Sequence, residues 1–252
     1  MSTTTDTDPS QATSILEEGP RLPLEIELIP LLYDVITIYP GSSQYRYPPS
    51  TLLEKYGHHT HHICFRNAKS SALLPFCPNA HNVAFWFNSS PSPDLLNLPV
   101  KRLTLDDFGF LTSRLERDPD DIQLAQWCSN ITHLTVADGF TEEDSRYLTH
   151  FPALEYLMTL ESGDDEGIRE ILKCFPQLKV VVRLLGPVSD DEKTQVVRDS
   201  QLEGLYQDIR VVKMDALFMA DWVRGAQGLG DVFDVAEREV EARRGALIMG
   251  SR

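Results

Sequence analysis

A short pattern of apolar and polar positions recurs along the chain. An apolar residue is followed by a breaker, a spacer, and then an apolar-x-x-apolar-x-apolar stretch whose last position varies. Such a stretch, with β-branched residues behind a turn signal, predicts a short buried strand. The copies are Cys77–Phe85, Cys128–Val136, Phe151–Thr159 and Phe175–Arg183, with Pro99–Leu105 as a fifth copy that lacks one spacer.

Helix signals lie between these predicted strands. Asp118-Pro119 precedes an apolar-sided stretch over 122–128, which predicts a helix capped by an aspartate. Thr141, with Asp144 three positions later, has the capping-box pattern. Further helices are expected over 52–56 and 168–175, from Asp190 towards Tyr206, and over 231–244.

The spacing of the repeated pattern predicts the architecture. Equivalent apolar positions lie 20 to 31 residues apart, and leucine-rich repeats place one strand and one helix in each unit of about 20–29 residues. We therefore predict an α/β fold, a leucine-rich-repeat-like right-handed solenoid over residues 33–219. It would have a parallel sheet of about eight short strands with irregular helical connections. A doubly wound sheet would need longer strands and a ligand-binding loop at a switch point, and the sequence has neither.

The two ends of the chain depart from this period. Residues 1–20 are rich in Ser, Thr and Asp and are predicted to be a disordered tail. Residues 220–252 are predicted to form a C-terminal capping helix and tail over the last repeat.

The composition of the chain narrows the range of possible binding partners. The formal net charge of the 252 residues is −15, which opposes binding to a phosphate backbone, so nucleic acid is not expected as a partner. We see neither a membrane-spanning apolar run nor a secretory signal, so membrane association and secretion are not expected. A cytoplasmic or nuclear protein without a cofactor is the expectation.

A curved parallel sheet would present alternate strand residues on its concave face. Trp, Tyr, Met and Arg are typical anchors of protein interfaces, although each could instead only pack against neighbouring strands. The candidate binding residues are Trp86, Arg102, Asp106, His133, Tyr156 and Met158, within a wider row that also holds Asn82, Ala84, Thr104 and Thr135.

Two segments suggest other chemistry. The four histidines of His58–His62 could bind a metal, and a metal-dependent hydrolase is the enzymatic alternative. On a strand, however, these histidines would alternate between the two faces. The glycines of Gly225–Gly230 fit neither phosphate-loop spacing, and we interpret them as a flexible turn before a helix.

The four cysteines have no metal-ligand spacing, and Cys alternates with Phe at one repeat position, as expected of buried reduced thiols.

Three further segments resemble the F-box-like leucine-rich-repeat proteins that are abundant in mushroom-forming fungi. Leu22-Pro23-Leu24-Glu25-Ile26 is similar to the opening of an F-box, and Pro30-Leu31-Leu32-Tyr33 to the segment just after one. A terminal block is also similar: residues 208–212 together with Asp221-Trp222, Gly225, Asp231 and Phe233.

The resemblance implies a function as well as a fold. In that family the F-box binds the adaptor subunit of a cullin-based ubiquitin ligase, and the repeats hold a protein substrate. Here only Glu27–Ile29 separate the opening from what should follow the box, so residues 21–32 correspond to a remnant with most of the F-box missing. The chain is thus expected to be a non-enzymatic protein-interaction module, similar to the substrate-recognition half of such an adaptor. The alternative is a free scaffold or decoy without ligase association.

Overall fold

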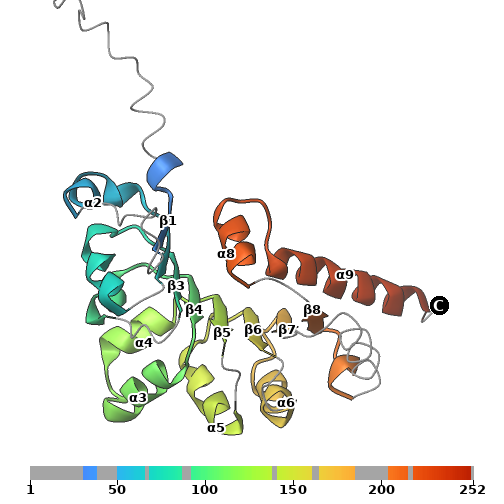
Figure 1. Cartoon of the computed structure of the whole chain (residues 1–252). Coiled ribbons are helices and arrows are strands. Elements are labelled where there is room, and N and C mark those ends of the chain that lie inside the picture. The colour runs from blue at the N-terminus through green and yellow to red at the C-terminus, as the bar shows by residue number, and fades with distance from the viewer. Residues whose placement is uncertain are drawn as a thin grey trace, which may run out of the picture.

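The computed structural model describes residues 31–38, 50–65, 68–86, 92–137, 141–160, 165–184, 204–214 and 218–250. The tail 1–20, most of the remnant 21–32 and most of the helix expected from Asp190 lie outside these residues. Within them the chain forms one eight-stranded sheet with interleaved helices (Figure 1).

All the pairings within the sheet are parallel, and its strand order is the sequence order, β1 to β8. The prediction of an α/β fold with a parallel sheet of short strands is confirmed. The strands are β1 (Val35–Ile38), β2 (His62–Phe65), β3 (Asn82–Phe85), β4 (Arg102–Leu105), β5 (His133–Val136), β6 (Tyr156–Leu160), β7 (Val180–Leu184) and β8 (Val211–Met214).

The repeated sequence pattern forms a repeated turn. In its four full copies, the N–H of the first strand-side apolar residue donates to the carbonyl of the residue three positions earlier. These bonds are Ala80 to Cys77, Ile131 to Cys128, Leu154 to Phe151 and Leu178 to Phe175, at 3.0–3.1 Å. Proline suits the second position of such a turn because its φ is already correct there. The residue that opens each turn is buried, so this position requires apolar volume, which Cys or Phe supplies.

Short helices connect the strands up to β7 and cover one face of the sheet (Figure 1). The α-helices are α2 (Ser50–Tyr56), α3 (Gly109–Arg117), α4 (Ile122–Cys128), α5 (Glu142–Ser145) and α6 (Asp165–Cys174). The 3₁₀ segments are η2 (Gly57–His59), η3 (Ala68–Phe76), η4 (Pro93–Asn97), η5 (Arg146–His150) and, before β8, η6 (Gly204–Gln207).

The capping predictions were partly right. Thr141 and Asp144 form the predicted capping box at α5. At α4 the cap is Asp121, whose Oδ1 accepts from the Leu124 N–H at 3.0 Å, and the predicted Asp118 is wrong. The reason is that the 110–128 unit holds a second helix, α3, which ends at Arg117 and leaves Asp118 at its C-terminal end.

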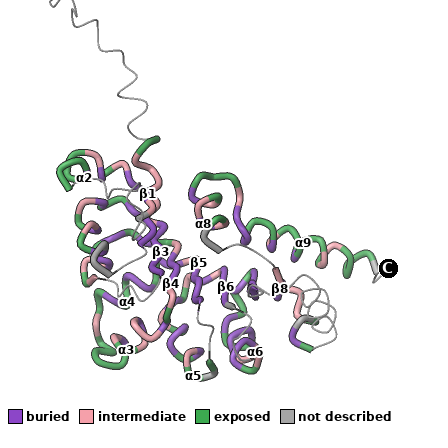
Figure 2. The backbone as a smooth tube through the Cα atoms, viewed as in Figure 1, coloured by how far each residue is buried: buried purple, intermediate pink, exposed green. Residues whose placement is uncertain are grey.

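Alternation along the strands divides the side chains between two layers. Ile63, Val83, Leu103, Leu134 and Leu157 are register partners on adjacent strands. All five are buried in the large core beneath the helices α2–α6 (Figure 2). Phe65 and Phe85 stack in the same layer, with ring centroids 5.2 Å apart.

Two further helices lie on the opposite face of the sheet, α8 (Phe218–Ala226) and α9 (Val232–Gly250) (Figure 1). α9 packs on β7 and β8, and it buries Val232, Phe233, Ala236 and Val240 against the sheet. α8 was not expected to be helical, and α9 extends six residues beyond the expected end at Arg244. None of the helices in the described part of the chain combines the length and apolarity needed to cross a membrane.

Candidate functional site

The predicted binding residues lie on the face opposite the helices α2–α6. Arg102, His133 and Tyr156 are the first residues of β4, β5 and β6 and are register partners, so they form one row across the sheet. Met158 lies one alternation further along β6 and is buried. These four side chains therefore lie on the same face of the sheet.

The other two predicted residues lie at the far ends of their strands. Trp86 directly follows β3 and is buried in a small cluster with Trp222 of α8. Asp106 directly follows β4, is partly exposed and is not among the residues that line the cavity described below. The six predicted residues are thus spread along the strands.

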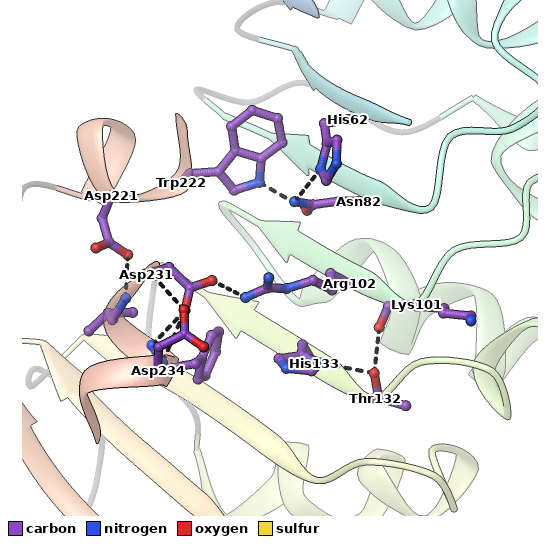
Figure 3. Close-up of polar contacts among 12 residues, drawn as sticks. His62, Asn82, Lys101, Arg102, Thr132, His133, Asp221, Trp222, Asp231 and Asp234 are labelled. Atoms are coloured by element: carbon purple, nitrogen blue, oxygen red, sulfur yellow. Dashed lines mark hydrogen bonds and ion pairs between the residues drawn. The ribbon is translucent and has the colours of Figure 1, made fainter. Parts of the chain in front are cut away.

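This face is covered within the chain by the α8–α9 hairpin. The C-terminal segment was expected over the last repeat, but its contacts extend across the sheet to β3 and β4, through Trp222 and Asp231 (Figure 3). As residues that bind a partner molecule, the predicted set remains a prediction. Their observed partners are side chains of α8 and α9.

Arg102 forms an ion pair with Asp231 (Figure 3). Oδ2 of Asp231 accepts from the guanidinium, while Oδ1 accepts from the N–H groups of Phe233 (2.9 Å) and Asp234 (3.2 Å). In return, the Asp231 N–H donates to Asp234 Oδ2 at 2.8 Å. One carboxylate therefore caps α9, where negative charge is favoured, and also holds the helix on the sheet.

His133 is enclosed by aromatic rings. It stacks on Tyr156 at 4.2 Å with the rings 8° from parallel, and the ring of Phe233 meets it edge-on at 5.3 Å. The Thr132 hydroxyl donates to the Lys101 carbonyl (3.2 Å) and so accepts from His133 Nδ1 (2.8 Å). Burial, with the nearby Arg102 charge, lowers the pKa of His133 to about 3, so its imidazole is neutral at pH 7 and is a poor proton acceptor.

Tyr156 is tied to α9 through its hydroxyl. The O–H donates to Glu237 Oε1 at 2.6 Å, and burial together with this carboxylate raises the pKa of the phenol. A phenol with a raised pKa stays protonated, so Tyr156 is a hydrogen-bond donor at pH 7.

A second hydrogen-bond chain holds α8. The indole Nε1–H of Trp222 donates to Asn82 Oδ1 at 3.1 Å, and Asn82 Nδ2 donates to His62 Nδ1 at 3.1 Å (Figure 3). Asn82 is almost completely buried, and a buried amide needs hydrogen-bond partners. Trp222 and His62, which lie far apart in the sequence, supply a partner to each end of it. Burial lowers the pKa of His62 to about 4, which keeps Nδ1 free to accept.

A cavity lies between this face and the α8–α9 hairpin. Its walls include Asn82, Arg102, His133, Asp221 and Trp222. The space open to a water molecule is about 20 Å³, which holds about one water. A small-molecule pocket is usually several hundred Å³, so this cavity is too small for a metabolite.

The glycine-rich segment forms the tight turn of this hairpin. Gly228 and Gly230 have φ values of +70° and +78°, a region that favours glycine. A Cβ at Gly225 would lie 2.8 Å from Asp231 Cβ and from Asp231 Oδ2, so the absence of a side chain lets α8 approach the cap of α9. The glycines therefore shape the turn that places Asp231 opposite Arg102.

The histidine run is divided between a 3₁₀ turn, a connecting residue and a strand. His58 and His59 belong to η2, His61 precedes β2, and only His62 is within the strand. In the described part of the chain, no three His, Cys, Asp or Glu side chains are arranged to hold a metal ion. The hydrolase alternative would need three such ligands.

The cysteines are free thiols. Cys64, Cys77 and Cys128 are buried, and burial raises the pKa of Cys128 to about 12. Cys174 is exposed, contrary to expectation, because it lies in the last turn of α6 on the solvent side. Its pKa is raised by a hydrogen bond to Glu170, so neither kind of site favours a reactive thiolate.

Comparison with family models, curated proteins and solved structures gives no match for this chain. The predicted binding residues do not include the hairpin's half of the site, which consists of Trp222, Asp231, Phe233 and Glu237. A local signal existed for one of them: Asp231 and Asp234, three positions apart directly after Gly230, have the spacing of a helix cap. No local signal connects that cap to Arg102.

Proposed function

We propose that this chain is a non-enzymatic protein-interaction module built as a right-handed, leucine-rich-repeat-like solenoid. The sequential strand order and the turn repeated at each helix-to-strand junction support this architecture, because each unit then packs on its neighbours alone. The resemblance of the sequence to F-box-like repeat proteins supports the same class and suggests the substrate-holding half of a ligase adaptor.

The observation that carries the proposal is the chemistry of the sheet face. It already holds a polypeptide, the α8–α9 hairpin, through an Arg–Asp pair, a Tyr–Glu hydrogen bond, an Asn–Trp hydrogen bond and stacked rings. Aromatic and Arg anchors within a packed surface are characteristic of protein interfaces. The cavity at this face has room for about one water (about 20 Å³), so the face suits a polypeptide better than a metabolite.

The margin of this face is open to a partner where the strands begin. Residues just before β3 to β7 form a continuous hydrogen-bonded row that includes Lys101, Thr132, Glu155 and Lys179. Lys101 and Lys179 are exposed, and the Lys179 ammonium lies 5.5 Å from the centre of the Tyr156 ring. We place the partner on this margin, where exposed charges surround the aromatic centre.

Affinity purification of the tagged full-length chain tests this placement. Lys179→Glu and Lys101→Glu should remove the partners that the unaltered chain retains. Lys173→Glu on α6 is a matched control, because Lys173 pairs with Glu170 at 3.2 Å much as Lys179 pairs with Glu155 at 2.8 Å. Partners that persist in both margin variants, or that disappear equally in the control, would disprove the margin as the interface.

The same purification separates the two forms of the proposal. Recovery of the cullin-ligase adaptor subunit with the chain would assign it to a ligase. A partner retained without that subunit would make the chain a free scaffold or decoy.

A further inference from the structure

The structure assigns a two-histidine binding site for a divalent late transition metal ion to His61 and His81, at the start of β2 and β3. The two residues are neighbours in the hydrogen-bonded row at this edge, since the His81 N–H donates to the His61 carbonyl at 3.0 Å.

The separation of the two rings suits chelation. Their centroids are 5.5 Å apart and their planes differ by 40°. With metal–nitrogen bonds of about 2.0–2.1 Å, two imidazoles on a tetrahedral ion have centroids roughly 5 Å apart. The observed separation of 5.5 Å is therefore close to that of two imidazoles on one ion.

Each ring also has a partner that orients it. His61 Nδ1–H donates to Asp34 Oδ1 at 2.7 Å, which leaves Nε2 of His61 with a free lone pair. His81 donates a ring N–H to the backbone carbonyl of Asn79, and the Asn79 side chain is itself fixed by donating to the His58 carbonyl at 2.6 Å. Metal-binding histidines typically donate their second nitrogen to a carboxylate or a backbone carbonyl in this way.

Access and charge also favour the pair. The His61 side chain is 45 % exposed, so an ion can reach it from solvent. The Asp34 carboxylate, which accepts from His61 at 2.7 Å, adds negative charge beside the pair.

The other histidines nearby are engaged differently. The His62 ring also lies near His81, with centroids 5.1 Å apart, but the two rings meet edge-on and His62 Nδ1 accepts from Asn82. His58 and His59 stack on one another at 3.9 Å. The site thus has two protein ligands, and water completes the coordination of the ion. Because two imidazoles favour ions late in the Irving–Williams order, Cu²⁺ should bind most tightly.

Titration of the untagged full-length protein with Cu²⁺, followed by calorimetry and electron paramagnetic resonance, tests the site. We expect one ion per chain with two nitrogen ligands. His61→Ala and His81→Ala should each weaken binding by at least about tenfold and leave one nitrogen in the spectrum. Asp34→Asn should weaken binding by roughly tenfold because the orienting carboxylate is lost.

Two control variants make the result decisive. His150→Ala in η5 and the double variant His58→Ala/His59→Ala should bind Cu²⁺ as the unaltered chain does. Binding that survives in both His61→Ala and His81→Ala, or that disappears in the His58/His59 variant, would overturn the assignment. So would a one-nitrogen spectrum of the unaltered protein. Circular dichroism of each variant separates loss of the site from loss of the fold.

Discussion

Arg102 and Asp231 form an ion pair although 129 residues separate them in the sequence. The Asp231 side chain is only 7 % exposed, whereas that of Arg102 is 28 % exposed. A carboxylate this deeply buried depends on its partner, because a buried charge without one is strongly destabilising. The pair therefore links the middle of the sheet to the beginning of the last helix.

Arg102→Met should lower the free energy of unfolding by about 1–3 kcal/mol, since it leaves the Asp231 carboxylate with only its helix-capping bonds. Asp231→Asn keeps the cap, so the double variant should recover part of the loss. Urea unfolding followed by tryptophan fluorescence measures this cycle. Additive effects of the two single changes would show that the ion pair contributes no coupling energy.

Gly225→Ala should destabilise the chain by about 1–3 kcal/mol, because the new methyl group would collide with Asp231. Gly245→Ala is the matched change in α9, where a Cβ has nothing within 4 Å. It should stabilise the chain by roughly 0.5–1 kcal/mol through helix propensity. Thermal unfolding of the two variants compares them directly, and equal shifts would contradict the close approach of α8 and α9.

Tyr156→Phe should cost about 1–2 kcal/mol, because it removes the 2.6 Å hydrogen bond to Glu237 and leaves a carboxylate short of a donor. The ring and its stacking on His133 are retained. Tyr33→Phe is a suitable control, since the Tyr33 hydroxyl has no hydrogen bond within the described residues. Chemical denaturation should separate the two variants, and a neutral Tyr156→Phe would mean that water replaces the bond without loss.

Stability should fall as the pH is lowered from 6.5 to 5. Burial lowers the pKa of His133 to about 3 and that of His62 to about 4, whereas in the unfolded chain both take up a proton near pH 6.5. The unfolded state therefore binds more protons in this interval. Each histidine should contribute a slope approaching 1.4 kcal/mol per pH unit near pH 5.

Urea unfolding between pH 5 and 6.5 measures how the free energy of unfolding changes with pH. His133→Gln should remove the part of this slope that His133 contributes, about 1.4 kcal/mol per pH unit near pH 5. An unchanged slope in that variant would show that His133 already takes a proton in the folded state.

Local chemistry explains which parts of the fold could be predicted from the sequence. The turns that begin at Cys77 and Phe151 need an apolar residue, a breaker and a spacer within four positions, and that pattern is visible in one stretch of chain. The capping box of Thr141 and Asp144 is equally local. Strand order followed from the same regularity, because short connections between parallel strands favour neighbours.

Only the half of the site that lies on the sheet could be predicted from the sequence. Arg102, His133 and Tyr156 occupy equivalent positions in successive units, so the sequence places them in one row. Their partners belong to a hairpin whose docking depends on contacts 129 to 140 residues away, and no short-range pattern contains that information. α8 was missed for a related reason. It is a nine-residue helix with Gly225 near its end, and its Trp222 packs on the sheet.

The sequential order of β1 to β8 has a consequence for folding while the chain is being synthesised. Each strand can pair with the one synthesised just before it, so the sheet and its layer of connecting helices can assemble progressively from the N-terminal side. The opposite face, with Tyr156, Met158, Val180 and Val182, acquires its cover only when residues 218–250 have been made. Until then it presents an apolar surface to the cell, so the newly made chain and any product that stops before α8 are the forms most exposed to aggregation and most in need of a chaperone.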